Sequence, residues 1–176
     1  MTQQAVVDLM DFCTEEMADL GIDIEIFDPR GNPMGLIINM KGSDSQTYLD
    51  VDRKIKNRNI ETAKRKRDFT VGMDPETTEA NLIERMKACF NFWKQKTGED
   101  AEGNPIYKDT IRIGGQELPS NKNEFGKLIA RRGFFFIRQQ VQEGMDKTAN
   151  FLPKVQTASA PTPSSPTNMT DPEKKE

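Results

Sequence analysis

The sequence contains no histidine among its 176 residues. Histidine is the side chain whose ordinary pKa lies nearest neutral pH, so its absence removes the commonest general acid-base group. It also removes Ser-His and Cys-His nucleophile pairs and every histidine-ligated metal site. Carboxylates are plentiful, but no pair stands in an apolar setting that would raise one pKa for acid-base work. We therefore expect no enzyme activity, no catalytic residue, no cofactor and no metal site.

Cysteine is scarce, and long apolar runs are absent. Cys13 and Cys89 are far apart in sequence, so they form neither a Cys-x-x-Cys pair nor a disulfide framework. This usage fits a reducing compartment. The N-terminus lacks a basic region followed by an apolar run, which predicts no signal peptide. No apolar stretch approaches the roughly 20 residues of a membrane span, so we expect no membrane partner.

Charge is unevenly distributed, although the net charge is only −3. Residues 1–28 carry eight acidic side chains and no lysine or arginine, whereas residues 53–67 carry eight basic side chains and one glutamate. A basic run without interleaved aromatic residues is weak support for nucleic-acid binding. We favour protein contacts for this run, with the acidic segment of the same chain or with a partner, over contacts with nucleic acid.

The first half of the chain predicts a helix, a β-hairpin and a second, capped helix. Residues 2–20 have the broad apolar stripe of a short acidic helix. Residues 22–27 alternate isoleucine with acidic residues, the period of a half-buried strand, and residues 34–40 return as its partner after a turn. The side chains of residues 42–45 offer caps for a helix from about residue 46 to residue 68.

The next segment predicts a core helix followed by irregular chain. Asp74 and Pro75 have the character of a helix start, an acidic cap followed by proline at the first helical position. The apolar face of this helix is expected to comprise Leu82, Ile83, Met86, Cys89, Phe90 and Trp93. Cys89 on that face is interpreted as an inert buried thiol. Residues 96–105 predict a long polar loop, and residues 105–113 a loosely alternating strand.

Residues 120–152 hold the densest apolar run and predict two helices. Asn121 and Glu124 have the spacing of a capping box, and Gly133 is expected to end the first helix. In the second helix an apolar set recurs at three- and four-residue steps and should face the core; it comprises Phe134, Ile137, Val141 and Met145. Neighbouring helical residues differ by about 100°, so at least one of Phe135 and Phe136 should be exposed.

Together these patterns predict an α+β fold with an N-terminal β-hairpin, a mainly α-helical remainder and a disordered C-terminal tail. The expected organisation is an acidic helix over residues 1–21, a single domain over residues 22–152 and a tail over residues 153–176. The tail is rich in Pro, Ser and Thr and has almost nothing to bury.

Three segments carry a resemblance to a known family. They are residues 24–48, with the hairpin and the capped helix; residues 89–93, expected to end a helix; and a C-terminal set, namely residues 118–120, Leu128, residues 136–137, residues 140–141 and residues 149–152. On these segments, which span roughly residues 22–152, the chain resembles the tail assembly chaperones of long-tailed bacteriophages. Residues 94–117 look longer than the family's usual loop after the tryptophan.

The resemblance implies a non-enzymatic protein of the host cytoplasm that takes part in viral tail assembly. Such chaperones bind the tape measure protein, keep it soluble and help to recruit tail tube protein subunits; whether copies also associate with one another stays open. We expect the partner-binding residues to be Phe135, Phe136, Met145 and Phe151. The alternative is a virion structural component, either a head-tail connector or a minor tail protein, which would also lack catalytic residues.

Overall fold

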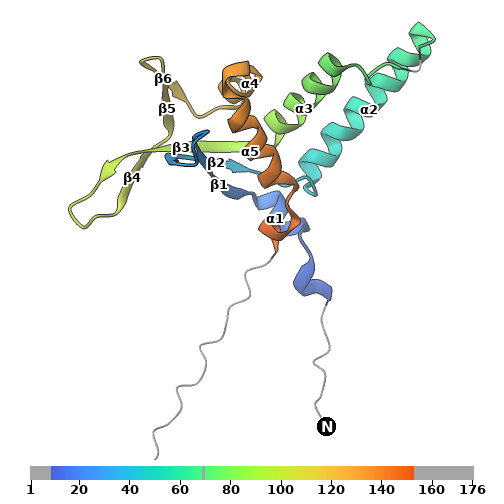
Figure 1. Cartoon of the computed structure of the whole chain (residues 1–176). Helices are drawn as coiled ribbons and strands as arrows, with labels where there is room; N and C mark the ends of the chain where they lie inside the picture. Colours follow the sequence, from blue (N-terminus) through green and yellow to red (C-terminus); the bar gives the residue numbers. More distant parts are fainter. Residues whose placement is uncertain (1–8, 69, 153–176) are drawn as a thin grey trace, which may run out of the picture.

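The computed structural model describes residues 9–68 and 70–152 (Figure 1). Its strands are β1 (Ile22–Phe27), β2 (Pro33–Met40), β3 (Phe90–Glu99), β4 (Pro105–Lys108), β5 (Thr110–Ile113) and β6 (Gln116–Pro119). Its α-helices are α1 (Glu15–Leu20), α2 (Gln46–Lys66), α3 (Pro75–Cys89), α4 (Lys122–Ala130) and α5 (Phe135–Asp146), and short 3-10 turns span Leu9–Phe12, Arg132–Phe134 and Thr148–Phe151. Strands β1 to β4 form one antiparallel sheet in chain order, and β5 pairs with β6. The expected α+β fold is confirmed.

Side-chain caps start three of the predicted helices where the sequence places them. The Ser45 hydroxyl accepts a hydrogen bond from the Tyr48 amide at 3.3 Å at the start of α2. The Asp74 carboxylate accepts from the Thr77 amide at 2.8 Å at the start of α3. At the start of α4, the Asn121 side chain accepts two backbone amides. Each cap satisfies N–H groups that have no partner within the helix.

The core lies where α5 and α4 pack against the sheet. Phe90 stacks on Phe125 with ring centroids 4.4 Å apart and meets Trp93 edge to face at 5.4 Å. All three side chains are fully buried. The Gln140 amide of α5 accepts a hydrogen bond from Phe27 N and donates one to Phe27 O, both at 2.9 Å. This pair satisfies backbone groups at the free edge of β1, which would otherwise be open to another strand.

The expected helix through Phe90 and Trp93 is wrong beyond Cys89, because the chain turns there into β3. Phe90 has an extended backbone, and Met40 and Ile38 of β2 pair with Phe90 and Trp93 respectively. A strand normally alternates its faces, so residues 90 and 93 should point in opposite directions. A register shift beside Met40 adds one residue on the β3 side, and both aromatic side chains thereby reach the core.

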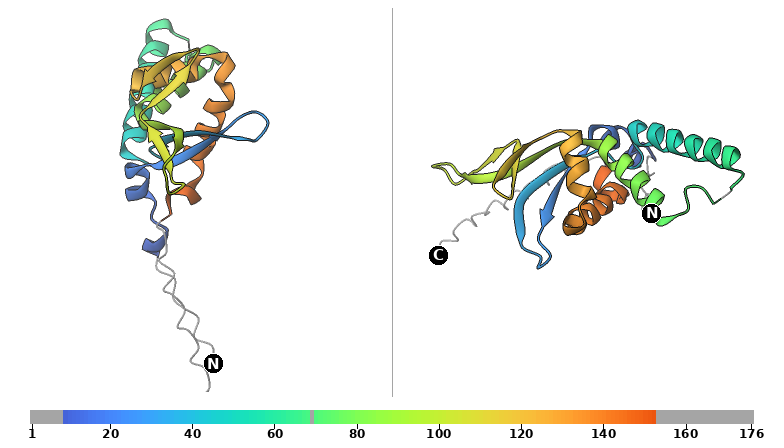
Figure 2. Two further views of the ribbon diagram at one scale, coloured as in Figure 1. Left: turned by 90° about the vertical axis from the view of Figure 1, so that its left-hand side faces the viewer. Right: turned by 90° about the horizontal axis from the view of Figure 1, so that it is seen from above.

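The expected polar loop over residues 96–105 is also wrong, because its two sides pair as β3 and β4. They project from the body as a hairpin that we call the β3–β4 arm, residues 96–109, on the opposite side from the far end of α2 (Figure 2). The turn repeats the Asp-x-x-Gly-Asn-Pro sequence found between β1 and β2. In both turns the Asp carboxylate accepts the backbone and side-chain N–H groups of the Asn, here Asn32 and Asn104.

The N-terminal segment is shorter as a helix than expected and packs onto the domain. The expected helix over residues 2–20 is a 3-10 turn at Leu9–Phe12 and then α1. Ala18 is fully buried, and its carbonyl accepts from Gly42 N at 3.0 Å. The Asp19 carboxylate accepts from Gln46 N at 3.0 Å, at the start of α2 rather than in its basic half. Residues 1–8 and the expected disordered tail, residues 153–176, lie outside the described residues.

The C-terminal helix pair breaks three residues earlier than expected. Helix α4 ends at Ala130, and its cap, Arg131, has an extended backbone and donates to Leu128 O at 3.2 Å. Gly133 therefore does not end α4; it lies in the following 3-10 turn and has no positive φ. Phe134 closes that turn, and α5 begins at Phe135.

Candidate functional site between α3 and α5

The four consecutive apolar residues at the start of α5 divide between core and solvent. Ile137 is buried, Phe134 and Phe136 are half-buried and packed against the core, and the side chain of Phe135 is 54% exposed. Val141 and Met145 continue the buried line. The prediction that one of Phe135 and Phe136 is exposed is confirmed for Phe135. The inward set is confirmed except that Phe134 is only half-buried, because it lies in the 3-10 turn before the helix.

The exposed ring of Phe135 is held in place by charged neighbours. The Arg138 guanidinium carbon lies 5.0 Å from the ring centroid, within the range of a cation-π contact. Arg138 also forms an ion pair with Glu79 of α3 and donates to Ile129 O at 3.5 Å. The Arg138 side chain is only 12% exposed, so its position is fixed by packing. Phe135 thus presents an aromatic face to solvent beside a guanidinium whose own position is fixed by packing.

A hollow of 460 Å³, which we call the α3–α5 groove, runs beside this ring. Its lining residues are Met73, Pro75, Thr78, Glu79, Leu82, Phe135, Arg138, Gln139 and Gln142. Met73 is 76% exposed and Leu82 is half-buried against the core. The groove therefore has apolar anchors from two helices and the preceding connection, with amide and charged groups along its rim.

Two of the expected partner-binding residues, Met145 and Phe151, lie in the core and form no part of an exposed surface. Ser43 N donates to the Met145 carbonyl at 3.2 Å, which ties the end of α5 to the chain before α2. The ring of Phe151 packs on Gly42 so closely that a Cβ there would lie 2.9 Å from it. Because the last 3-10 turn folds back over α1 and the end of β2, Phe151 closes the core.

Sequence reasoning missed Met73 as a site residue, although a signal was present. Met73 directly precedes Asp74, the residue that caps α3. An apolar residue at this position usually packs on the fourth residue of the helix, forming a hydrophobic staple. That fourth residue is Thr78, whose hydroxyl donates to Gly72 O at 3.3 Å. Met73 therefore has no apolar staple partner at that position, a feature that could have marked it as exposed.

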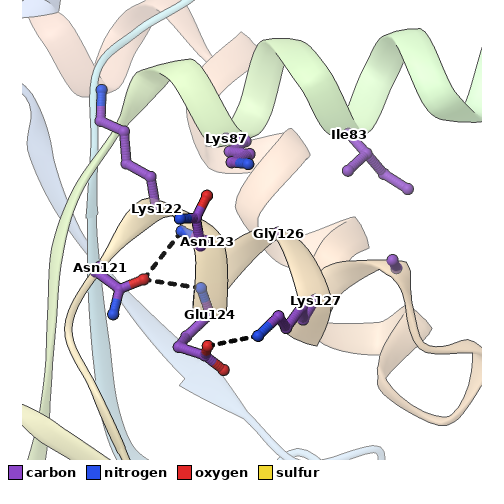
Figure 3. A pocket seen from close by; sticks show the side chains of 9 residues that line it. Ile83, Lys87, Asn121, Lys122, Asn123, Glu124, Gly126 and Lys127 are labelled. Carbon is purple, nitrogen blue, oxygen red and sulfur yellow. Dashed lines mark hydrogen bonds and ion pairs between the residues drawn. The ribbon is translucent and has the colours of Figure 1, made fainter.

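A second hollow, of 680 Å³, lies between α3 and α4 and has a basic rim (Figure 3). Lys122 Nζ donates to the Ala88 carbonyl at 2.7 Å, and Lys127 pairs with Glu124 at 2.7 Å. Lys87 lies over Gly126, and a Cβ added to Gly126 would lie 3.1 Å from the Cδ of Lys87. Two of the three lysines thus already bind protein groups that join or stabilise the helices, so this hollow is a weaker candidate than the α3–α5 groove.

Chemistry at the remaining reactive groups is limited in the described part of the chain. Burial raises the pKa of the Cys89 thiol to about 11, although the Ser45 hydroxyl bonds to it and opposes the rise. The thiol is therefore protonated at neutral pH and unreactive as a nucleophile. Among residues 9–68 and 70–152, no group of three or more Cys, Asp or Glu side chains is placed to hold a metal ion. Within the same ranges, no helix combines the length and apolar character of a membrane span.

Comparisons with protein-family models, with curated proteins and with solved structures found no match.

Proposed function

We propose that this protein is a tail assembly chaperone of a long-tailed bacteriophage, and that it binds an amphipathic helix of the tape measure protein in the α3–α5 groove. The observation that carries the proposal is Phe135, an aromatic side chain that is 54% exposed and yet held by Arg138 in an apolar groove. Exposed apolar surface rimmed by polar groups is typical of a protein-binding site. The family itself is proposed from the sequence resemblance.

The groove suits a helix whose apolar residues recur at three- and four-residue spacing. Phe135 and Leu82 would receive the apolar side chains of the client, and Met73 would adapt its flexible thioether to their shape. The rim amides of Gln139 and Gln142 would meet the polar flank of the same helix. In the host cytoplasm such binding would keep the tape measure protein soluble until tail tube protein subunits assemble around it.

A virion structural component, a head-tail connector or a minor tail protein, is the second candidate. It is favoured by the β3–β4 arm, since an extended hairpin that stands clear of its own core is suited to interlocking with neighbouring subunits. Detection of the protein in purified particles would support this candidate, whereas a chaperone is expected to be absent from the finished tail.

Co-expression with the tape measure protein tests the proposal. The wild-type chain should keep the client in the soluble fraction, whereas a Phe135→Ser variant should lose most of this effect because the central aromatic anchor is gone. Phe12→Ser is a matched control, since Phe12 is 57% exposed but lies in the N-terminal 3-10 turn. Circular dichroism should show that both variants are folded.

Two outcomes would contradict the proposal at different levels. If folded Phe135→Ser solubilises the client as well as the wild type does, the α3–α5 groove is not the binding site. If the wild-type chain leaves the client insoluble, the chaperone function itself is refuted and the structural component takes its place. Equal loss in the Phe12→Ser control would show a general effect of surface polarity instead of a specific anchor.

A further inference from the structure

The far end of α2 carries unpaired positive charge. Nearer the core the cations of α2 have partners: Arg58 pairs with Glu84 at 2.7 Å and Lys56 pairs with Asp52 at 2.6 Å. Four further cations lie in the last turn of α2 and in the residue that caps it, and all four are exposed: Lys64, Arg65, Lys66 and Arg67. In the described part of the chain none of these four forms an ion pair. We call these four residues the basic end. The carboxylates of Asp68 and Asp74 accept hydrogen bonds from Thr70 and Thr77 and also interact electrostatically with Lys66, so they offset part of the positive charge of the basic end without forming an ion pair.

The β3–β4 arm has the opposite charge and no core of its own. Every side chain from residue 96 to residue 109 is exposed, including those of Ile106 and Tyr107. The arm carries Glu99, Asp100, Glu102 and Asp109 against Lys96 and Lys108, a net charge of −2, and Glu99 pairs with Lys96 at 2.5 Å. An isolated two-stranded hairpin is marginally stable in water, so an arm of this length gains order when a second surface covers it.

The two charged elements cannot meet within one molecule. The β3–β4 arm and the far end of α2 project in opposite directions from the core in Figure 1 and in the right-hand view of Figure 2. The acidic α1 also does not neutralise the basic end, because its Asp19 bonds the start of α2. We propose that the β3–β4 arm of one copy binds the basic end of a second copy, so that the chains associate head to tail.

Head-to-tail association has a geometric consequence. The two surfaces in contact differ, so a pair of bound copies leaves one arm and one basic end free. Such an assembly continues as an open chain or closes into a ring when the rotation between copies allows it. The exposed Ile60 on α2, at 52%, and Ile106 on the arm, at 46%, supply apolar surface beside the charges.

Sedimentation velocity of the full chain over a concentration series tests this inference. The mean mass of the wild type should rise with concentration, and less so at high salt, since exposed charges are screened. Glu99→Lys/Glu102→Lys and Lys64→Glu/Arg65→Glu should each weaken self-association about tenfold, because the first makes the arm positively charged and the second leaves the basic end without net charge. An equimolar mixture of the two variants should regain pairwise association, because the unchanged arm of one variant then meets the unchanged basic end of the other.

A control reversal separates the specific contact from net charge. Glu15→Lys/Glu16→Lys makes the same change in net charge as the arm variant, at two exposed residues of α1, and should leave association as in the wild type. A wild type that stays monomeric at low salt, or a mixture that fails to regain association, overturns the inference. Wild-type binding to duplex DNA that Lys64→Glu/Arg65→Glu abolishes, with self-association unchanged, assigns the basic end to nucleic acid and also overturns it.

Discussion

Replacing Gly144 with alanine should destabilise the protein, although alanine is the better helix former. Gly144 lies in α5 where the helix crosses Ile24 of β1. An added Cβ would stand 2.5 Å from Ile24 Cδ1, 3.0 Å from its Cγ1 and 3.4 Å from its Cγ2. Ile24 is β-branched and therefore stiff at its first side-chain torsion, so turning its terminal methyl does not clear all three contacts. Helix α5 must move away from the sheet.

Two opposing effects set the magnitude. Alanine gains up to about 1 kcal/mol over glycine in a helix interior. Overpacking a well-packed contact usually costs about 1–3 kcal/mol. The expected net loss is about 1 kcal/mol in the free energy of unfolding, and up to about 2 kcal/mol if the helix cannot shift.

Gly126→Ala in α4 provides a matched comparison with the opposite expected sign. There the added Cβ would meet only Lys87, whose Cδ lies at 3.1 Å at the flexible end of a long side chain. The helix-propensity gain should therefore survive, leaving this variant as stable as the wild type or up to about 1 kcal/mol more stable.

Urea denaturation of the full chain measures both variants, with midpoints compared at an unchanged slope. The double variant Gly144→Ala/Ile24→Val completes a double-mutant cycle that measures the coupling between these two residues. Removing Ile24 Cδ1 should alone cost about 0.5–1.5 kcal/mol, and it should cost less in the Gly144→Ala background because the clash goes with it. Strict additivity of the two changes, or a Gly144→Ala variant more stable than the wild type, would refute the steric argument.

Three further outcomes are expected. Phe90→Ala should lower the free energy of unfolding by about 3–5 kcal/mol, because it empties a fully buried site stacked on Phe125; a loss within about 0.5 kcal/mol would mean that the core is wrongly placed. Asp28→Ala should lower stability near neutral pH and converge with the wild type in acid. Hydrogen bonds, first that from the Asn32 side chain, hold the pKa of the Asp28 carboxyl below its usual value, so its contribution is present above the unfolded pKa and lost as pH falls through the folded one; a difference that persists unchanged in acid would argue against this. A chain that ends at Lys154 should melt within a few degrees of the full chain, since the segment it lacks has almost nothing to bury, and a large drop in melting temperature would show that this segment packs.

Features that depend on neighbouring residues were predictable from the sequence. Ser45, Asp74 and Asn121 cap their helices because a short polar side chain reaches amides two or three residues ahead, whatever the rest of the chain does. The strand at residues 22–27 was predictable for the same reason, since its alternation matches the period of a pleated backbone. The exposure of Phe135 followed from the 100° step between helical neighbours.

Features that depend on distant partners required the tertiary structure. Phe90 and Trp93 continue the helical spacing of α3, so periodicity alone extends that helix; pairing with β2 and the register shift beside Met40 make them strand residues instead. The candidate site also could not be predicted from residues that are adjacent in sequence. Phe135 is visible as a surplus aromatic residue, but its groove exists only because α5 lies across from Met73 and the start of α3. Local hydrogen bonds and periodicity depend on residues that are adjacent in sequence, so the sequence alone determines them. The α3–α5 groove and the opposite placement of the β3–β4 arm and the basic end depend on where folding puts remote segments, so only the tertiary structure decides them.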